Sequence, residues 1–385
     1  MKKKSISLFQ EKLSSLNLKN HNLLSYQGTH VAINLNNLKS NLNYLKENLE
    51  PSTKIMCIVK AFAYGSDPLI IGDFLEKNNV DYLAVAYTNE GVKLRLSGIK
   101  LPILVLHPQI DDFDEILKCN LEPNIYSFRI LDRFLSKSKK HPFHLKFNTG
   151  LNRLGFKIDD VDLLYDILGH GNNIKYLFSH LGASDDVKEK DFTMSQIELF
   201  DTISKKMSNK FNKVFKKHLL NTSGILNYHD YQYDMVRTGI GLYGYGNDKD
   251  YNKKLKPVLT LNSIISQIHN VQKNESVGYN RGFITEKDYK IGIIPIGHAD
   301  GISRALGNGK IGFRINNQIA HTIGNICMDM LMVDITNIEC KEGDMVSIID
   351  DKDQTAEEIG NISDTISYEI LTALSSRMKR IIIEN

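Results

Sequence analysis

A lysine that ends an apolar segment is the first residue in this sequence whose type and position indicate chemistry. Ile55 to Val59 is continuously apolar, and Lys60 and then Ala61-Phe62-Ala63-Tyr64-Gly65 follow it. A lysine partly removed from water has a lowered pKa, and its neutral amine can attack an aldehyde. A single such lysine more often only extends its charged end into solvent. Lys60 therefore predicts a site only together with other residues.

Other polar residues also end the apolar segments that follow along the chain. They are Lys146, Asn148, His180, Asn221, Ser223 and Arg237. Each alone can be a hydrogen-bonded core residue, as a single histidine usually is. In a barrel of parallel strands, however, the carboxyl ends of the strands meet at one rim, where active sites lie. Together these residues predict a site at such a rim.

The elements that would carry these residues are short apolar segments that alternate with amphipathic helical stretches. The strand-like segments are Lys54–Val59, Tyr82–Ala86, Ile103–His107, Glu122–Tyr126, His144–Phe147, Lys175–Ser179, Lys217–Leu220 and Tyr233–Val236. Such alternation is typical of parallel strands joined by crossover helices. Eight units predict an α/β fold with a (β/α)8 barrel, and a doubly wound open sheet is the alternative.

The pattern changes after Leu255-Lys256-Pro257, where strand-like segments separated by turn residues replace the helical stretches. These segments are Val258–Ile268, Lys290–Ile296, Lys310–Ile315, Ile319–Ile323, Met330–Ile335 and Met345–Ile349, and helical periodicity returns from Tyr368 to Arg380. We therefore expect an N-terminal extension over 1–30, a barrel over 31–255 and a C-terminal mostly-β domain over 256–385.

Composition limits the classes of function. The 385 residues carry a formal net charge of +3 and are 42% hydrophobic, values typical of a globular protein and not of a nucleic-acid-binding one. The four cysteines are far apart, which predicts no zinc motif and a reducing cytoplasm. The first residues do not resemble an export signal, and no stretch of the sequence is apolar over the roughly eighteen residues that a membrane helix needs. We expect no metal, no nucleic acid and no membrane.

The segment Gly239-Ile240-Gly241-Leu242-Tyr243-Gly244 has the spacing of a dinucleotide-binding motif. That motif needs an early βαβ unit and a helix that begins at the turn, and neither is expected here. The backbone amides of Gly239 and Ile240, with the hydroxyl of Ser223, are instead candidates for binding a phosphate near the last two barrel strands. Lys60 opposite a phosphate site suits pyridoxal phosphate.

At these residues the sequence resembles the alanine racemases, and the resemblance covers nearly the whole chain. Val59 to Gly65 resembles the family's pyridoxal-phosphate attachment segment, with Phe62 in a variable position, and Val277-Gly278-Tyr279-Asn280-Arg281 resembles the segment of the opposing tyrosine. The resemblance implies a Schiff base at Lys60, with Lys60 and Tyr279 as the bases on the D and L sides. It also implies a homodimer, in which each tyrosine comes from the partner subunit.

The resemblance implies roles for the other candidates as well. Arg237 would face the pyridine nitrogen of the cofactor, and His180 would stack near the ring and orient that arginine. The implied phosphate ligands are Tyr64, Ser223, Gly239, Ile240 and Tyr368. Arg153 and the backbone amide of Met328 would bind the substrate carboxylate, and Lys146 would be carbamylated.

Two residues depart from the family pattern: His298 replaces a tyrosine that helps to gate substrate entry, and Asn148 stands where aspartate is frequent. Both concern substrate range more than reaction type. The function expected is interconversion of L- and D-alanine for peptidoglycan. A serine or broad-specificity racemase is one alternative. A pyridoxal-phosphate homeostasis protein is another, but proteins of that kind lack a β domain.

Overall fold

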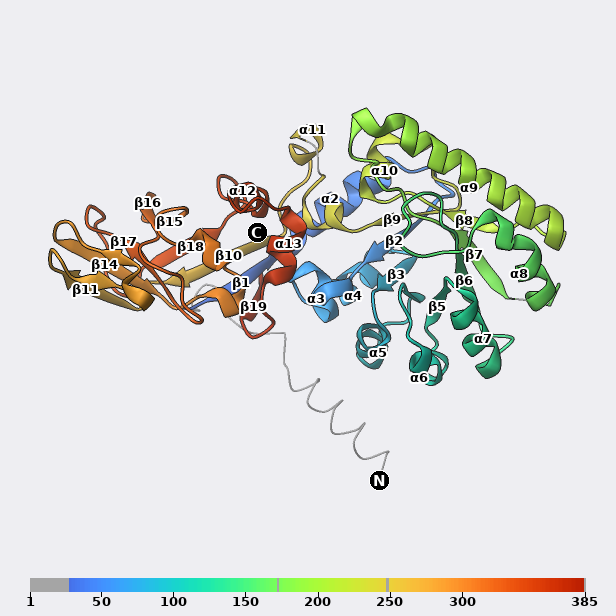
Figure 1. Cartoon of the computed structure of the whole chain (residues 1–385), viewed down its shortest axis with the longest axis horizontal. Coiled ribbons are helices and arrows are strands. Elements are labelled where there is room, and N and C mark those ends of the chain that lie inside the picture. The colour runs from blue at the N-terminus through green and yellow to red at the C-terminus, as the bar shows by residue number, and fades with distance from the viewer. Residues whose placement is uncertain (1–27, 172, 247–248, 384–385) are drawn as a thin grey trace, which may run out of the picture.

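The computed structural model describes residues 28–171, 173–246 and 249–383. Residues 1–27 of the expected N-terminal extension therefore lie outside the described part of the chain. Figure 1 shows two lobes, with the barrel on the right and a mostly-β domain on the left.

The barrel contains the eight strands β2(Lys54–Ile58), β3(Tyr82–Val85), β4(Ile103–Val105), β5(Glu122–Ile125), β6(Phe143–Lys146), β7(Ile174–Phe178), β8(Lys216–His218) and β9(Met235–Thr238). The strands are parallel, and β9 pairs with β2 to close the ring. The prediction of a (β/α)8 barrel is confirmed, and the open-sheet alternative is wrong because the two outer strands are hydrogen-bonded to each other.

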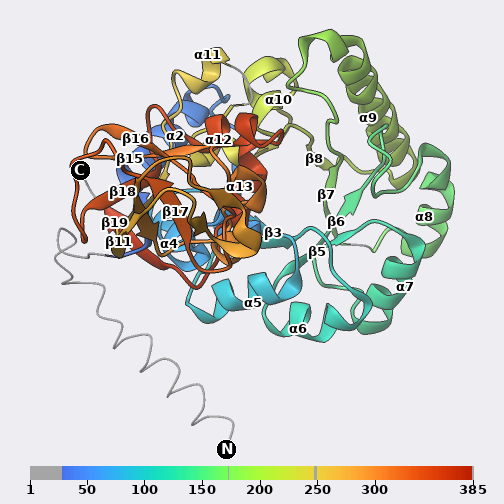
Figure 2. The same cartoon turned by 60° about the vertical axis from the view of Figure 1, so that its left-hand side comes forward.

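Helices surround the barrel, as Figure 2 shows for α5 to α9. They are α3(Lys60–Tyr64), α4(Pro68–Lys77), α5(Thr88–Leu96), α6(Phe113–Lys118), α7(Phe128–Lys137), α8(Val161–Leu168), α9(Lys190–Phe211) and α10(Thr222–Asn227). Local sequence explains several boundaries. Asp67 caps α4 by accepting from the amides of Leu69 and Ile70, with Pro68 in the first turn.

The C-terminal domain contains a six-stranded sheet in the order β16-β15-β18-β10-β1-β19, a three-stranded sheet β11-β14-β17 and the hairpin β12-β13. Their bounds are β1(His30–Asn34), β10(Leu259–Ile264), β11(Gln267–Val271), β12(Ser276–Val277), β13(Phe283–Ile284), β14(Tyr289–Ile294), β15(Gly312–Ile315), β16(Gln318–His321), β17(Leu331–Asp334), β18(Met345–Ile349) and β19(Lys379–Ile383). The expectation of a mostly-β second domain is confirmed.

Shorter elements complete the chain. The remaining helices are α2(Leu35–Glu47), α11(Lys249–Asn252), α12(Ala356–Ile362) and α13(Ser367–Ala373). The 3-10 turns are η2(Ile110–Asp112), η3(Ile158–Asp160), η4(Val187–Glu189), η5(His229–Tyr231), η6(Ile240–Tyr243), η7(Tyr279–Arg281), η8(His298–Asp300) and η9(Arg304–Leu306). The dinucleotide motif rejected above corresponds to η6, which is only a short turn.

Two strands differ from the sequence prediction. The helical stretch predicted up to Arg380 ends at Ala373 in α13, and Lys379 to Ile383 form β19. β1 precedes the barrel in sequence but pairs with β10 and β19, so residues 30–34 belong to the sheet of the C-terminal domain. Long-range pairing explains both cases. It outweighs local helix periodicity at the C-terminal end, and it joins residues 31–34, expected in the barrel domain, to the second domain.

The two lobes share one continuous hydrophobic core, which runs from the barrel strands into β10, β15 and β18. Helix α13 of the C-terminal domain lies beside α3, the helix that begins with Lys60 (Figure 1). The C-terminal domain therefore supports the end of β2 directly. No helix in the described ranges is both long enough and apolar enough to cross a bilayer.

Candidate active site

Lys60 begins an unusual turn at the end of β2. Ala61, Phe62, Ala63 and Tyr64 all have positive φ values, between 50° and 55°, so α3 is one turn of left-handed helix. Each such residue costs about 1–2 kcal/mol. Strain of this kind persists only where surrounding contacts maintain it, and it often marks a functional site. Glu90 supplies one such contact, since its Oε1 accepts from the Ala61 amide at 2.7 Å.

The C-terminal domain supplies other contacts to the same turn. Arg380 in β19 donates from Nη2 to the Gly65 carbonyl at 2.8 Å and from Nε to the Ser66 carbonyl at 2.9 Å. Its guanidinium also lies 5.0 Å from the centre of the Phe62 ring. Gly65 has φ +80°, and a Cβ there would collide with the Leu371 carbonyl oxygen of α13. The conformation after Lys60 thus depends on the second domain.

Four cationic side chains lie near one another at the barrel mouth: Lys60, Lys146, Arg153 and Arg237. Burial and the nearby charge of Arg153 lower the pKa of Lys60, while Glu90 partly opposes this. Burial, Arg237 and Arg153 lower the pKa of Lys146 to about 7, and its Nζ lies 4.7 Å from the centre of the Phe178 ring. A positive, partly desolvated mouth attracts anions and favours neutral amines on the lysines.

Arg237 is buried in β9 and held by several acceptors. Its Nη2 donates to the carbonyls of Ser179 at 2.7 Å and Leu219 at 2.6 Å, and its Nη1 donates to His218 Nδ1 at 2.5 Å. His180 Nδ1 lies 3.2 Å from the same Nη2. Burial lowers the pKa of Arg237 to about 9, so the guanidinium stays charged at neutral pH. Burial and Arg237 hold the pKa of His180 well below its usual range.

The phosphate candidates form a pocket at the ends of β8 and β9. The Tyr64 ring stacks on Tyr243 with 4.6 Å between centroids, and the Tyr368 ring lies 6.0 Å from Tyr64. A Cβ on Gly239 would collide with the Tyr64 hydroxyl, so only glycine leaves this space open. The buried Ser223 is the second residue of α10 and lies in its first turn, where backbone N–H groups lack intrahelical acceptors.

These groups fit a phosphate. Hydroxyls and helix-end amides are the donors that bind phosphate oxygens. Ile240 is the first residue of η6, and Ser223 lies in the first turn of α10. The Gly239 amide already donates to Thr222 Oγ1, at a long 3.2 Å, so a phosphate would compete with that bond. Lys60, Tyr64, Ser223, Gly239 and Ile240 therefore lie at one rim, as their positions after β2, β8 and β9 require.

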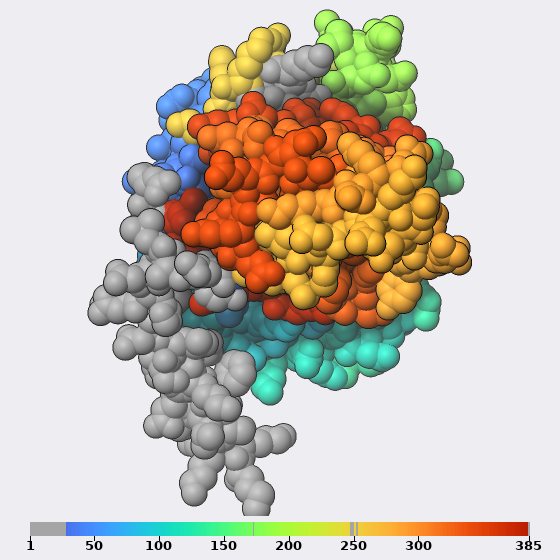
Figure 3. Space-filling model, turned by 90° about the vertical axis from the view of Figure 1, so that its left-hand side faces the viewer, coloured from blue at the N-terminus to red at the C-terminus, as the bar shows by residue number. Residues whose placement is uncertain are grey.

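The structure does not bring every candidate to this rim. Tyr279, in η7 between β12 and β13, is 68% exposed, and Met328 is 58% exposed. In Figure 3 the gold segment that contains β11 to β13 forms an open surface of the C-terminal domain. Among the described residues, no side-chain contact joins Tyr279 or Met328 to Lys60. Arg153 is exposed at the mouth, beyond Asn148.

The two departures from the family pattern have clear local environments. Asn148 Oδ1 accepts from the amides of Gly150 at 3.1 Å and Asn152 at 3.0 Å, so asparagine organises the loop that leads to Arg153. His298 is exposed in η8, and its amide donates to the Cys327 carbonyl at 2.9 Å. Its neighbour Asp300 is buried and accepts from Arg377 Nε at 2.6 Å. Histidine at 298 leaves this ion pair in place.

Several residues of the site were not found from the sequence. Glu90 and Arg380 fix the turn after Lys60, Thr222 holds the loop of Gly239, and His218 binds Arg237. Glu90 and Thr222 occupy ordinary positions for capping or loop residues. His218 lies in the short strand β8 and faces the barrel interior, where a polar residue in an apolar segment could have been noticed.

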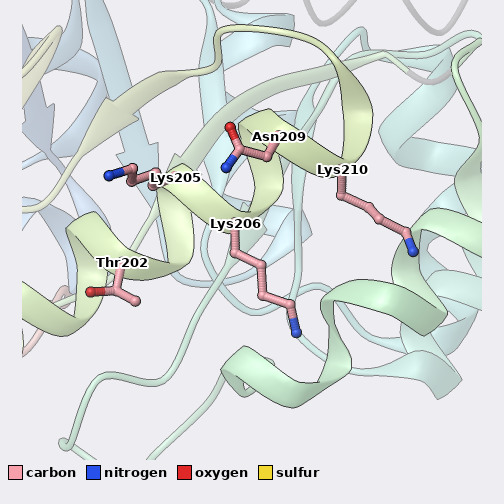
Figure 4. A pocket seen from close by; sticks show the side chains of 5 residues that line it. All are labelled: Thr202, Lys205, Lys206, Asn209 and Lys210. Carbon is pink, nitrogen blue, oxygen red and sulfur yellow. The ribbon is translucent and has the colours of Figure 1, made fainter.

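A shallow groove elsewhere on the surface carries no site chemistry. It is lined by Thr202, Lys205, Lys206, Asn209 and Lys210 along the outer helix α9, and the side chains in Figure 4 spread apart instead of converging. Lys206 and Lys210 pair with Asp162 at 3.1 and 2.9 Å. Exposed pairs of this kind are typical of a solvated helix face.

The fold and the rim define a class of enzyme: a barrel whose mouth combines a partly desolvated lysine with a phosphate-binding pocket, joined to a β domain. The family model for the alanine racemase N-terminal domain matches residues 33–247, and the model for the C-terminal domain matches residues 258–382.

Individual relatives agree. The alanine racemase of Clostridium tetani is 35% identical over 370 residues, which cover 92% of this chain and 95% of that protein. The structure of the Clostridium difficile alanine racemase has a TM-score of 0.85 at 33% identity, covering 93% of this chain and 96% of that one. The Bartonella henselae alanine racemase, solved with covalently bound pyridoxal phosphate, has a TM-score of 0.83 at 27% identity, covering 92% and 99%. The chain belongs to the alanine racemase family, a family of isomerases.

Proposed function

We propose that this chain interconverts L-alanine and D-alanine, with pyridoxal 5'-phosphate bound at the barrel mouth and attached to Lys60. The observation that carries the proposal is that Lys60 lies at the same rim as the pocket of Tyr64, Ser223 and Gly239, and has a lowered pKa. The covalently bound cofactor of the Bartonella henselae relative supports this assignment.

The cofactor would be held by the residues that fit it. Tyr64, Ser223, Gly239, Ile240 and Tyr368 would bind the phosphate. When bound, pyridoxal phosphate supplies a conjugated ring that delocalises the electron pair left after an amino acid loses its α-proton. The remaining chemistry belongs to side chains of the protein.

Arg237 and His180 would set the electrostatics at the ring. A guanidinium can only donate hydrogen bonds, so Arg237 keeps a proton away from the position opposite it. This restrains electron withdrawal and therefore side reactions such as transamination. His180, kept neutral by burial and by Arg237, accepts from that arginine and limits its movement.

Two bases on opposite faces of the α-carbon would exchange the protons. Lys60 Nζ would take or return a proton on the D side, and the Oη atom of Tyr279 would do so on the L side. Racemisation is balanced, because one proton leaves one face and another arrives at the opposite face. Each base contributes roughly 10² to 10⁴ in rate.

Tyr279 would come from a second copy of the chain in a head-to-tail homodimer. Its side chain is 68% exposed, and Met328, Met330 and Ile284 of the same domain are 58%, 45% and 43% exposed. Exposed apolar residues gathered on one domain are typical of an interaction surface. A dimer with two shared sites would bring Tyr279 to the partner's Lys60, so the monomer would be inactive.

The substrate carboxylate would be bound by Arg153 and the amide of Met328. Lys146, whose pKa is about 7, has a neutral amine available to add carbon dioxide, which gives a carbamate and releases one proton. The negative carbamate would pair with Arg153, which no longer has to share this region with a second cation. Metal plays no part in this assignment.

D-alanine made in this way would supply peptidoglycan synthesis in the cytoplasm. The four cysteines are free thiols, which suits a reducing compartment. A serine or broad-specificity racemase remains the alternative, since His298 and Asn148 lie where the family uses other residues. A homeostasis protein of the barrel type would have no second domain to carry Tyr279.

The test is an absorbance spectrum combined with an assay for D-alanine. The purified protein with added pyridoxal phosphate should absorb near the edge of the visible range, and Lys60→Ala should remove that band. Lys54→Ala, at the exposed opposite end of β2, is the matched control and should keep it. A colourless wild type would refute the cofactor assignment. A higher specificity constant for L-serine or L-lysine than for L-alanine would refute the substrate.

A further inference from the structure

A row of hydrogen-bonded polar side chains crosses the interior of the barrel, away from the rim. Arg237 Nη1 lies 2.5 Å from His218 Nδ1, His218 Nε2 lies 3.0 Å from His144 Nδ1, and His144 Nε2 lies 2.9 Å from Glu122 Oε2. These residues come from the strands β9, β8, β6 and β5 and are all buried. The proposed function uses Arg237 and none of the other three.

Arg237 and Glu122, at the two ends of this hydrogen-bonded row, fix the direction of every hydrogen bond in it. A guanidinium can only donate, so His218 Nδ1 carries no proton. A carboxylate can only accept, so His144 Nε2 carries one. The bond between the rings then runs from His218 Nε2–H to His144 Nδ1, and both imidazoles are neutral Nε2–H tautomers.

Charge and burial agree with that assignment. Burial, followed by Arg237, holds the pKa of His218 well below its usual range, and burial lowers that of His144 despite Glu122. Burial alone would raise the pKa of Glu122, but hydrogen bonds and charges from His144 and Lys175 outweigh it and lower that pKa. Lys175 Nζ lies 2.5 Å from Glu122 Oε1.

We propose that Glu122 is a positioning residue for Arg237, acting through the tautomers of His144 and His218. The inference rests on the proposed function, in which Arg237 faces the cofactor ring. Two backbone carbonyls hold Nη2 of Arg237, so the bond to His218 is the contact that orients Nη1. The reverse tautomers would turn an Nδ1–H of His218 toward a guanidinium N–H, and the arginine would have to move.

Glu122→Gln keeps the size and shape of the side chain but no longer fixes the direction of the hydrogen bonds through His144 and His218. A glutamine side chain both donates and accepts, so it can satisfy either tautomer of His144. The matched control is Tyr82→Phe, which removes a long 3.4 Å hydrogen bond to the same Oε2 atom and leaves the carboxylate charged. Both positions are buried in the barrel, so the pair separates the loss of the acceptor from general disturbance of the core.

The test is nitrogen NMR of the full-length apoprotein with ¹⁵N-labelled histidine, which distinguishes protonated from unprotonated ring nitrogens without cofactor or turnover. Wild type and Tyr82→Phe should show Nε2–H tautomers for His144 and His218. Glu122→Gln should show an Nδ1–H population at His218. Its kcat for alanine should fall about tenfold, with cofactor content unchanged, which corresponds to about 1.4 kcal/mol in the barrier.

Two outcomes would overturn the inference: Nδ1–H at either histidine in wild type, or unchanged tautomers and kcat in Glu122→Gln. If that variant does not fold, the wild-type tautomers still decide, because the proposal requires Nε2–H at both rings. The inference can fail separately from the proposed function. Racemase activity with reversed tautomers refutes only the role of Glu122, whereas the predicted tautomers without racemase activity refute the proposed function.

Discussion

The close approach of α13 to the turn after Lys60 can be tested by adding one methyl group. In Gly65→Ala, the new Cβ would collide with the Leu371 carbonyl oxygen and would also sit at φ +80°. The positive φ costs about 1–2 kcal/mol for a residue with a Cβ. Forcing an extra carbon into a packed contact adds about 1–3 kcal/mol. We therefore expect a total loss of about 2–5 kcal/mol in the free energy of unfolding.

Gly98→Ala is the matched control for backbone strain alone. Gly98 has φ +104°, but a Cβ there meets nothing within 4 Å. Urea denaturation of both apoproteins at one protein concentration should show the larger loss for Gly65→Ala. That variant should also bind pyridoxal phosphate more weakly, because a displaced α13 carries Tyr368 away from Tyr64. Equal stability losses and equal cofactor affinities in the two variants would refute the supporting role of α13.

Three further variants test other contacts of the site. Arg380→Met removes the hydrogen bond to the Gly65 carbonyl and should lower the free energy of unfolding by about 2–4 kcal/mol, whereas Arg314→Met, which loses surface pairs, should cost under about 1 kcal/mol in urea denaturation. Lys146→Met should stabilise the apoprotein in CO₂-depleted buffer most below pH 7, where the native state must bury the charge. The gain in the free energy of unfolding of Lys146→Met over wild type should shrink as the pH rises from 7 to 10.5, because native Lys146 is already neutral there while the unfolded lysine still binds a proton. A gain that does not change with pH would contradict the lowered pKa of Lys146. Tyr279→Phe should slow proton removal from L-alanine, measured by loss of α-deuterium, far more than it weakens cofactor binding; loss of cofactor would show that its role is misassigned.

The barrel strands could be predicted because each is a short apolar segment followed by a polar residue, as in Ile55 to Lys60. Counting eight units predicted a closed barrel, but the register that closes it could not be predicted, since the β2–β9 ladder pairs Lys54 with Met235, far along the sequence. β1 and β19 were missed for the same reason. Their local sequences are brief, and their pairing joins the two ends of the chain.

The candidate site was predictable only where its residues end strands. The left-handed turn could not be predicted, because Ala61 to Tyr64 contains no glycine and is held in place by Arg380 and Glu90. Glu122 and His144 are the first residues of two predicted strands, whereas the candidate site residues were sought where strands end. Alternation along β6 places His144 on the same inner face as Lys146, a signal that a period of two could have provided.

Tyr279 is the residue for which one chain gives the least information, since its proposed partner belongs to another copy. Its resemblance to the family's tyrosine segment predicted the role, and its exposure in the structure is compatible with a shared site. A site formed by Lys60 of one subunit and Tyr279 of the other makes activity depend on the homodimer.

Subunit complementation tests that claim most directly. Lys60→Ala and Tyr279→Phe should each be nearly inactive in alanine racemisation. When the two variants are mixed and allowed to exchange subunits, half of the dimers become mixed, and each mixed dimer has one site with both bases intact. Activity should return to about a quarter of wild type, the fraction of intact sites expected for random pairing of such dimers. No recovery in a mixture that forms mixed dimers would contradict an active site shared between Lys60 of one subunit and Tyr279 of the other.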